Sequence, residues 1–342
     1  MNAMRHLRYL TSLCIIFIFS SLSLKAQLAK KYAGYGEYYY KGLRYGLFMP
    51  AGYDPKKSYP LIVYMHGSRD TVSRDLGWYQ QPVQREHPCF VLTPKCEVSD
   101  QGWGNTWKDG HTAATAKTLS LVDSLVRHYP IDVNRLYIYG ISMGGFGVFS
   151  VLAKEKGKFA AAYSVCGGSD VAAAGKLTGT PLWIFHGAID DIVPVSLSRD
   201  PYKEIIRLGG KTVRYTEYPG VKHNSWENVS QEKSLSKWLF AQRKGQASEF
   251  PDAVDHLRIG KPDDSNILLM WDKPAQPGKP GQEVWYYKLL KDAALVTEIE
   301  GGTFTYSDPS REAGTGHTYS LIAVNYFFQE SKPVAVKVAA KK

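Results

Sequence analysis

The sequence predicts an α/β domain built on a doubly wound, mostly parallel sheet and followed by a small all-β sandwich. Two observations carry this prediction. Up to residue 247, short apolar runs alternate with segments of helical periodicity, which is the pattern of parallel strands joined by crossover helices. From residue 251 onward, short strand-like runs follow one another with turns between them. At 342 residues the chain is long enough for both domains.

Residues 1–26 are typical of a secretory signal. Arg5 and Arg8 precede an apolar stretch from Leu10 to Leu24, and Ala26 is a small residue at the expected cleavage point. No later stretch is long and apolar enough to span a bilayer. The sequence therefore predicts an exported protein, periplasmic or extracellular, without membrane insertion after signal cleavage.

The charge and cysteine content restrict the partners. Lys and Arg number 42 against 32 Asp and Glu, but no basic run or stripe is present, so nucleic acid is not an expected partner. Export leaves Cys89, Cys96 and Cys166, and no CxxC or HxxxH pair accompanies them, so we expect no metal site and no cofactor. A bridge between Cys89 and Cys96 is disfavoured, because the strand expected between them carries the chain farther than a disulfide spans.

Two strands and a helix are expected before the central motif. Tyr59–Met65 is a continuous apolar run suited to a central strand that is covered on both faces. A second strand, Cys89–Thr93, leads through a long loop to a segment of helical periodicity at Asp109–His128. The loop holds Trp103 and Trp107, which either line a substrate cleft or pin the loop, and the sequence favours neither alternative.

The stretch around Ser142 is the feature around which the first domain is organised. A β-branched and aromatic run ends at Gly140 and a helical pattern begins near Gly144, so Ser142 is expected on a sharp turn between strand and helix. Glycines two positions away on each side let the strand and the helix pack closely. A glycine-rich turn without chemistry fits the five-residue pattern alone, but the flanking strand and helix favour a nucleophile.

Two further strand ends provide partners for this serine. The runs Pro181–Phe185 and Val213–Tyr218 lead to Asp190 and His223 respectively, so Ser, Asp and His follow in chain order. His223 is expected to take the serine proton and return it to the leaving group, while Asp190 orients the imidazole and stabilises its charged form. The alternatives for the acid are the adjacent Asp191, then Glu217 and Glu227.

An oxyanion formed at Ser142 needs hydrogen-bond donors. The helix expected after Ser142 directs its first backbone N–H groups toward that point, which makes Met143 one candidate for the oxyanion hole. The strand that leads into His66 and Gly67 makes the backbone N–H of Ser68 the second candidate. His66 itself is expected to be a buried histidine with its hydrogen bonds satisfied.

Four motifs carry a resemblance to a known superfamily. They are Tyr64-Met65-His66-Gly67, Gly140-Ile141-Ser142-Met143-Gly144-Gly145, His186-Gly187-Ala188-Ile189-Asp190-Asp191-Ile192-Val193-Pro194 and Val221-Lys222-His223-Asn224-Ser225-Trp226. With them, residues 35–244 resemble the α/β-hydrolase superfamily, closest to phospholipase/carboxylesterase-type enzymes and to feruloyl and acetylxylan esterases. In those relatives the aspartate three residues after the His-Gly glycine is the triad acid, which implies Asp190 here. The sequence departs from many relatives at Ser68, where they carry Gly, Ala or a large apolar residue.

A second domain is predicted at residues 251–342, after a catalytic domain at residues 27–247. Trp271, the pair Tyr286 and Tyr287, and the segment Gly316–Leu321 resemble a fibronectin type III domain, with Tyr319 in the tyrosine-corner position. Such modules often act as spacers, and direct sugar binding is the alternative. The seven expected strands are Val254–Ile259, Asn266–Trp271, Val284–Leu290, Ala294–Ile299, Thr303–Tyr306, Thr318–Asn325 and Val334–Ala339.

Together these features predict an exported serine esterase that works through an acyl-enzyme. Export, the appended sandwich and the two tryptophans favour acetyl or feruloyl groups on plant polysaccharides or oligosaccharides as substrates. One alternative is a peptidase of the prolyl oligopeptidase kind, which usually carries a large gating domain that this sequence does not show. The other is a catalytically inactive hydrolase fold that binds carbohydrate.

Overall fold

The computed structural model describes residues 34–68, 77–96, 102–246, 249–260, 266–274, 281–309 and 315–340, so the predicted signal at residues 1–26 lies outside the described residues. The chain divides into two compact units. The first unit comprises Met1–Gly209 and Arg214–Gln231, and the second comprises Gly210–Val213 and Glu232–Lys342. The domain boundaries expected from the sequence stay a prediction.

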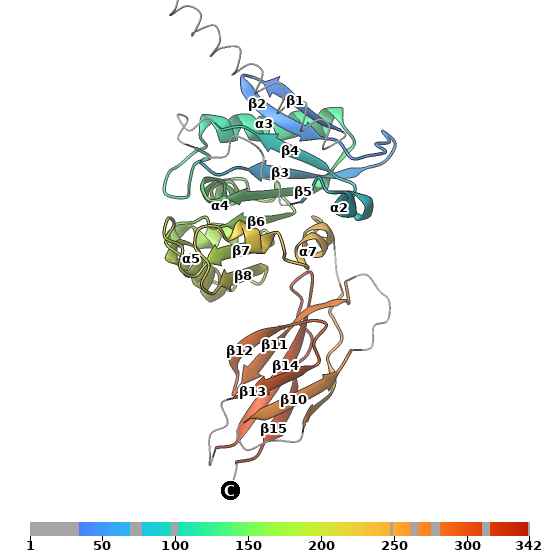
Figure 1. Ribbon diagram of the computed structural model, residues 1–342, viewed down its shortest axis with the longest axis vertical. Coiled ribbons are helices and arrows are strands. Elements are labelled where there is room, and N and C mark those ends of the chain that lie inside the picture. The colour runs from blue at the N-terminus through green and yellow to red at the C-terminus, as the bar shows by residue number, and fades with distance from the viewer. Residues whose placement is uncertain are drawn as a thin grey trace, which may run out of the picture. The chain divides into compact units, whose positions relative to one another are not determined.

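An eight-stranded sheet forms the centre of the first unit, with strand order β1-β2-β4-β3-β5-β6-β7-β8 (Figure 1). The β4–β3, β3–β5, β5–β6 and β6–β7 pairs are parallel, and the β1–β2 and β2–β4 pairs are antiparallel. This confirms the mostly parallel sheet. The strands are β1 (Tyr35–Tyr40), β2 (Leu43–Phe48), β3 (Tyr59–Met65), β4 (Phe90–Pro94), β5 (Ile131–Ile141), β6 (Ala161–Val165), β7 (Leu182–Gly187) and β8 (Val213–Tyr218).

Helices connect these strands and pack against the sheet. The long helix begins at Ala113 rather than at the predicted Asp109, because the Thr112 side chain accepts a hydrogen bond from the Thr115 N–H and caps it there. The helix after Ser142 packs against β3, β5 and β6. The helices are α2 (Gln81–Glu86), α3 (Ala113–His128), α4 (Met143–Lys154), the 3₁₀ helix η2 (Val171–Leu177), α5 (Ser196–Arg207) and α6 (Trp226–Val229).

The register of the central strands brings the functional loops to one edge of the sheet. All residues of β3 are buried, as expected for a strand covered on both faces. Met65 at the end of β3 pairs with Gly140 of the parallel strand β5. The segments that leave these two strands, carrying Ser68 and Ser142, therefore start from the same edge.

The second unit contains two antiparallel sheets, with strand orders β13-β10-β9 and β12-β11-β14-β15. Their core includes Trp271, Tyr287 and Tyr319, and the Trp271 and Tyr287 rings meet edge to face at 5.5 Å. Within the described residues there are seven strands, close to the predicted bounds. The elements are α7 (Leu235–Ala241), β9 (Asp255–Ile259), β10 (Ile267–Asp272), β11 (Val284–Lys291), β12 (Ala294–Glu300), β13 (Thr305–Asp308), β14 (His317–Asn325) and β15 (Val334–Val338).

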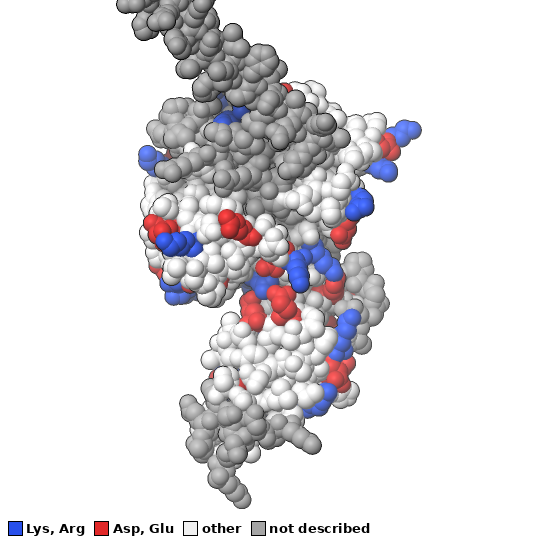
Figure 2. All heavy atoms as spheres, viewed as in Figure 1, with Lys and Arg blue, Asp and Glu red and all other residues white. Residues whose placement is uncertain are grey.

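The charge distribution on the surface and the apolarity of the helices bear on the partners of the chain. On the face shown in Figure 2, the basic side chains that are drawn are scattered among acidic and uncharged ones and do not gather in one patch. Among the residues that the structure describes, no helix has the length and apolarity needed to cross a membrane.

Candidate active site

Ser142 lies on a sharp turn between β5 and α4. Its backbone angles are φ 54° and ψ −117°, a conformation that costs free energy for any residue with a Cβ atom. Its N–H donates to the Val165 carbonyl at 2.8 Å, and its own carbonyl accepts from the Phe146 N–H at 3.1 Å. These bonds to β6 and to the first turn of α4 hold the strained turn in place.

The glycines around Ser142 are required by close backbone packing. A Cβ atom on Gly140 would lie 2.2 Å from the Gly144 carbonyl oxygen, and one on Gly144 would lie 1.8 Å from the Met65 carbonyl oxygen. Real Cβ atoms do not approach backbone so closely, so α4 can start against β3 and β5 only with glycine at both positions. The spacing of the Gly-x-Ser-x-Gly motif is therefore explained by contacts of the backbone.

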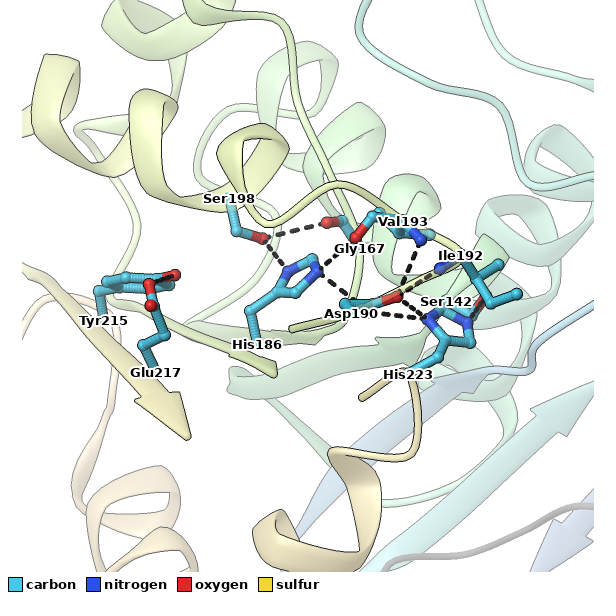
Figure 3. A network of polar contacts seen from close by, with 10 residues as sticks. All are labelled: Ser142, Gly167, His186, Asp190, Ile192, Val193, Ser198, Tyr215, Glu217 and His223. Atoms are coloured by element: carbon cyan, nitrogen blue, oxygen red, sulfur yellow. Dashed lines mark hydrogen bonds and ion pairs between the residues drawn. The ribbon is translucent and has the colours of Figure 1, made fainter. Parts of the chain in front are cut away.

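A chain of hydrogen bonds links Ser142, His223 and Asp190 (Figure 3). His223 Nε2 lies 2.9 Å from Ser142 Oγ, and His223 Nδ1 lies 2.8 Å from Asp190 Oδ2 and 3.0 Å from Oδ1. The His223 ring meets the Trp226 ring edge to face at 5.8 Å. The structure thus brings together the three residues that the sequence singled out from three separate strand ends.

Asp190 follows β7, and its carboxylate is fully buried. Its Oδ1 accepts the N–H groups of Ile192 and Val193, both at 2.9 Å. The neighbouring Asp191 is about half exposed and pairs with Lys222 at 3.0 Å. His223 therefore meets Asp190 and not Asp191.

The two outside candidates for the acid are bonded elsewhere. Glu217 accepts both nitrogens of the Arg199 guanidinium fork, at 2.7 and 2.9 Å. Glu227 accepts the side-chain amide of Asn224 at 3.1 Å. The described hydrogen bonds thus leave Asp190 as the carboxylate that faces His223.

The two predicted oxyanion donors occupy suitable places in the chain. Met143 is the first residue of α4, where backbone N–H groups have no partner within the helix. Ser68 is exposed and follows β3 at the edge of the sheet from which Ser142 also emerges. Residues 69–76 lie outside the described residues, and the oxyanion role of Ser68 and Met143 stays a prediction.

His66 has the hydrogen bonds expected of a buried histidine. Its Nδ1 lies 2.7 Å from the Gly67 carbonyl oxygen, and its Nε2 accepts the Cys96 N–H at 2.9 Å. The ring is 6% exposed and lies edge to face with Trp103. This confirms the interpretation of His66 as a residue with satisfied bonds.

Trp103 and Trp107 differ in burial. The Trp103 ring is fully buried; it packs over Gly147 of α4 and donates to the His66 carbonyl at 2.9 Å. It therefore pins the loop. Trp107 is 48% exposed, and its ring lies 6.0 Å from that of Phe146. Both line a cleft of about 310 Å³ beside Ser142, and their role in binding substrate stays a prediction.

Cys166 is a site neighbour that the sequence did not single out. It follows β6, and its sulfur lies with side-chain atoms of Asp190 and His223 inside a cluster 4.8 Å across. Burial raises the pKa of this thiol to about 12, so it stays protonated at neutral pH. A protonated thiol is a poor metal ligand, and Asp190 and His223 are bonded to each other, so the trio does not suit a metal ion.

The strand order, the turn at Ser142 and the hydrogen-bonded Ser, His and Asp are those of an α/β-hydrolase-like core, and the chain is similar to serine hydrolases and esterases. The model of the prolyl oligopeptidase family matches residues 101–179. A solved structure of a thermostable esterase is 32% identical, with a TM-score of 0.56, and the match covers 62% of this chain and 64% of that one.

Two further similarities concern named esterases. A bifunctional acetylxylan esterase/xylanase from Neocallimastix patriciarum is 26% identical over 150 residues, which is 43% of this chain and 21% of that protein. A ferulic acid esterase from Anaeromyces mucronatus is 14% identical with a TM-score of 0.45, covering 57% of this chain and 85% of that chain. The chain thus spans about a fifth of the curated relative that it matches.

Proposed function

We propose that this chain is an exported serine esterase that cleaves carboxylic esters with Ser142, His223 and Asp190. The observation that carries the proposal is the unbroken set of hydrogen bonds from Ser142 Oγ through both nitrogens of His223 to the buried carboxylate. Support for export comes from the signal-like residues 1–26, which lie outside the described residues.

Acylation begins when Ser142 Oγ attacks the ester carbonyl carbon. His223 Nε2 takes the hydroxyl proton, and the ester carbonyl oxygen becomes an oxyanion held by the N–H groups of Met143 and Ser68. Asp190 keeps Nδ1 protonated and stabilises the imidazolium. When the tetrahedral intermediate collapses, the ester C–O bond breaks, and the alcohol leaves with the proton from Nε2.

Deacylation repeats the same steps with water. His223 takes a proton from the water as its oxygen attacks the acyl carbon, and the second intermediate then expels Ser142 Oγ, which recovers its proton from Nε2. The carboxylic acid is released and the side chains return to their starting state. The chain's own groups supply every proton transfer in this cycle.

Acetyl or feruloyl groups on plant polysaccharides are the proposed substrates. The exposed ring of Trp107 and the nearby Phe146 give a planar acyl group apolar surface to stack on, next to Ser142. The similarity to an acetylxylan esterase/xylanase also supports a polysaccharide ester. The cleft volume of about 310 Å³ accommodates either acyl group.

The test compares wild type with Ser142→Ala on acetylated xylan, feruloylated arabinoxylan and p-nitrophenyl acetate. We expect acetate or ferulate release from the polysaccharides by wild type and none above background by the variant. Activity on p-nitrophenyl acetate alone would keep the ester chemistry and reject the polysaccharide substrate. No activity on any of the three would reject the esterase.

A peptidase is the second candidate, because the family model that matches residues 101–179 is that of the prolyl oligopeptidase family. The same Ser142 and His223 would then cleave an amide. Peptidyl p-nitroanilides test this directly: hydrolysis faster than that of p-nitrophenyl acetate, and lost in Ser142→Ala, would favour the peptidase.

We also propose that the second unit is a fibronectin type III-like module that acts as a spacer. The split into three and four strands supports this, and so does the buried Tyr319 near the start of β14, whose hydroxyl donates to the side chain of Asp308 at the end of β13. Binding of the isolated second unit to xylan in a pull-down experiment would contradict a spacer role.

A further inference from the structure

The buried carboxylate of Asp190 has a second histidine beside it. Asp190 Oδ1 accepts the two backbone N–H groups of the following turn and lies 3.0 Å from His223 Nδ1, while two histidine rings contact Oδ2. There His223 Nδ1 lies at 2.8 Å and His186 Nε2 at 3.2 Å, on another side of the carboxylate (Figure 3). A buried carboxylate depends on such neighbouring groups for its orientation.

His186 is itself held on both nitrogens. It lies at the end of β7 and is fully buried, and its Nδ1 is 2.8 Å from the Ser198 hydroxyl on α5. Its Nε2 also lies 3.0 Å from the Val193 carbonyl oxygen. Ser198 Oγ lies 3.0 Å from the Gly167 carbonyl oxygen, so polar contacts run without a break from Gly167 to Ser142 (Figure 3).

The partners of His186 fix its tautomer. Burial lowers the pKa of His186, so the ring is neutral and carries one N–H. Both groups facing Nε2, the Val193 carbonyl and the Asp190 carboxylate, only accept hydrogen bonds, so the proton belongs on Nε2. Nδ1 then accepts, and it competes with the Gly167 carbonyl oxygen, 3.0 Å from the same hydroxyl, for the single proton of Ser198.

We propose that His186 is a positioning residue for the reaction, which holds the Asp190 carboxylate toward His223, and that Ser198 selects the tautomer in which it does so. This inference rests on the proposed function of Ser142, His223 and Asp190. In the opposite tautomer the Nε2 lone pair would face the carboxylate, and the repulsion would turn the carboxylate from His223.

The test uses pairs of variants at these two positions, assayed on p-nitrophenyl acetate for kcat and KM, with Ser142→Ala as the blank. His186→Leu removes the donor to Asp190, and His186→Gln keeps an N–H at the same distance along the side chain. Ser198→Ala removes the hydroxyl that selects the tautomer. Ser164→Ala is the matched control, because it removes a fully buried hydroxyl that bonds to the Gly145 carbonyl.

We expect kcat to fall about 10- to 100-fold in His186→Leu with KM within about threefold, since the polar contact of Nε2 with the charged carboxylate is lost. His186→Gln is expected to stay within about fivefold of wild type, and Ser198→Ala to lose about 3- to 10-fold in kcat. Ser164→Ala is expected to keep kcat within about twofold of wild type, because the hydrogen bond that it removes joins two uncharged groups.

Three outcomes would overturn the inference. The first is an unchanged kcat in a folded His186→Leu variant. The second is an equal loss in the Leu and Gln variants that follows their melting temperatures. The third, which decides the matter if His186→Leu does not fold, is a wild-type kcat in the Ser198→Ala variant. A wild type no faster than Ser142→Ala would instead reject the proposed function, and this inference with it.

Discussion

Asp190 and Asp191 are adjacent carboxylates with opposite surroundings. Asp190 is buried and shares its oxygens among two backbone N–H groups and His223, whereas Asp191 is exposed and faces Lys222. A carboxylate in the first setting stabilises an imidazolium, while one in the second is screened by water. The chemical difference between them arises from the turn after β7 and not from residue type.

Replacing these two residues separately tests that difference. Asp190→Asn is expected to lower kcat by about 10³- to 10⁴-fold, because an amide holds the wrong tautomer and cannot stabilise the imidazolium. Asp191→Asn removes one exposed ion pair, and we expect kcat within about twofold of wild type. The measurement is kcat on p-nitrophenyl acetate, and the reverse order of losses would move the acid to Asp191.

For Trp103 and Trp107, the sequence predicted the place in the chain but not the role of each side chain. Both were placed correctly in a loop before the long helix, but the sequence could not separate a cleft residue from a pinning residue. The distinction depends on Gly147, where the absence of a side chain leaves room for Trp103 against α4. Such a contact between distant segments leaves no periodic signal. His186 stood within a quoted motif, yet its role depends on Ser198 in the same way.

Trp107 offers a test of the acyl preference. Trp107→Ala is expected to lower kcat/KM for ferulate release about 10-fold, because an aromatic stacking partner is lost, and to change acetate release less than threefold. Tyr39→Ala is the matched control, since Tyr39 is an exposed aromatic residue on β1, at the edge of the sheet. Equal losses of ferulate and acetate release would reject a stacking role for Trp107.

At the scale of elements, long apolar runs were predicted well and short mixed ones were not. Strand β3 has the predicted bounds, because its seven residues are apolar and covered on both faces. Strand β6 was not predicted, since its alanine-rich sequence fits a helix as well as a strand. Helix α5 contains Pro201, which usually marks a helix end. Tertiary packing decides both elements.

Helix α5 and strand β8 are joined by the ion pair of Arg199 and Glu217, which makes the stability depend on pH. Hydrogen bonds from Arg199 lower the pKa of Glu217 in the folded chain. A lowered carboxyl pKa adds stability above the ordinary value of 4.5, and that stability is lost as the pH falls below it through the lowered pKa. Both side chains are partly exposed, so the pair contributes about 0.5–1 kcal/mol.

Arg199→Ala is therefore expected to lower the free energy of unfolding in urea by about 0.5–1 kcal/mol at pH 7. The difference from wild type should shrink as the pH falls below 4.5. Arg207→Ala is the control, because it breaks an exposed pair with Glu204 inside one helix and is expected to change the free energy of unfolding less than Arg199→Ala does. A difference that stays constant from pH 7 to pH 3.5 would show that Arg199 acts through packing alone.

At the scale of the whole molecule, the residues of the proposed reaction all belong to the first unit. Ser142 and Asp190 precede Gly209, and His223 lies within Arg214–Gln231. The helix α7, which the sequence assigned to the first domain, is grouped with the second unit. There the Trp238 ring is fully buried and lies 6.1 Å from Trp285. A cut after residue 250 therefore removes packing from α7 but leaves the reacting groups together.

Residues 27–250 alone are expected to keep kcat and KM on p-nitrophenyl acetate within about threefold of the full chain, while their urea midpoint falls. The loss of stability follows from Trp238, whose buried aromatic surface contributes roughly 2–3 kcal/mol when it is covered. A red shift of tryptophan emission in the shorter chain would report that exposure. Ser142→Ala in the same shorter chain sets the background. Every group assigned to the reaction is present in residues 27–250. If this shorter chain is folded by circular dichroism and yet inactive, residues after 250 must help to build the site.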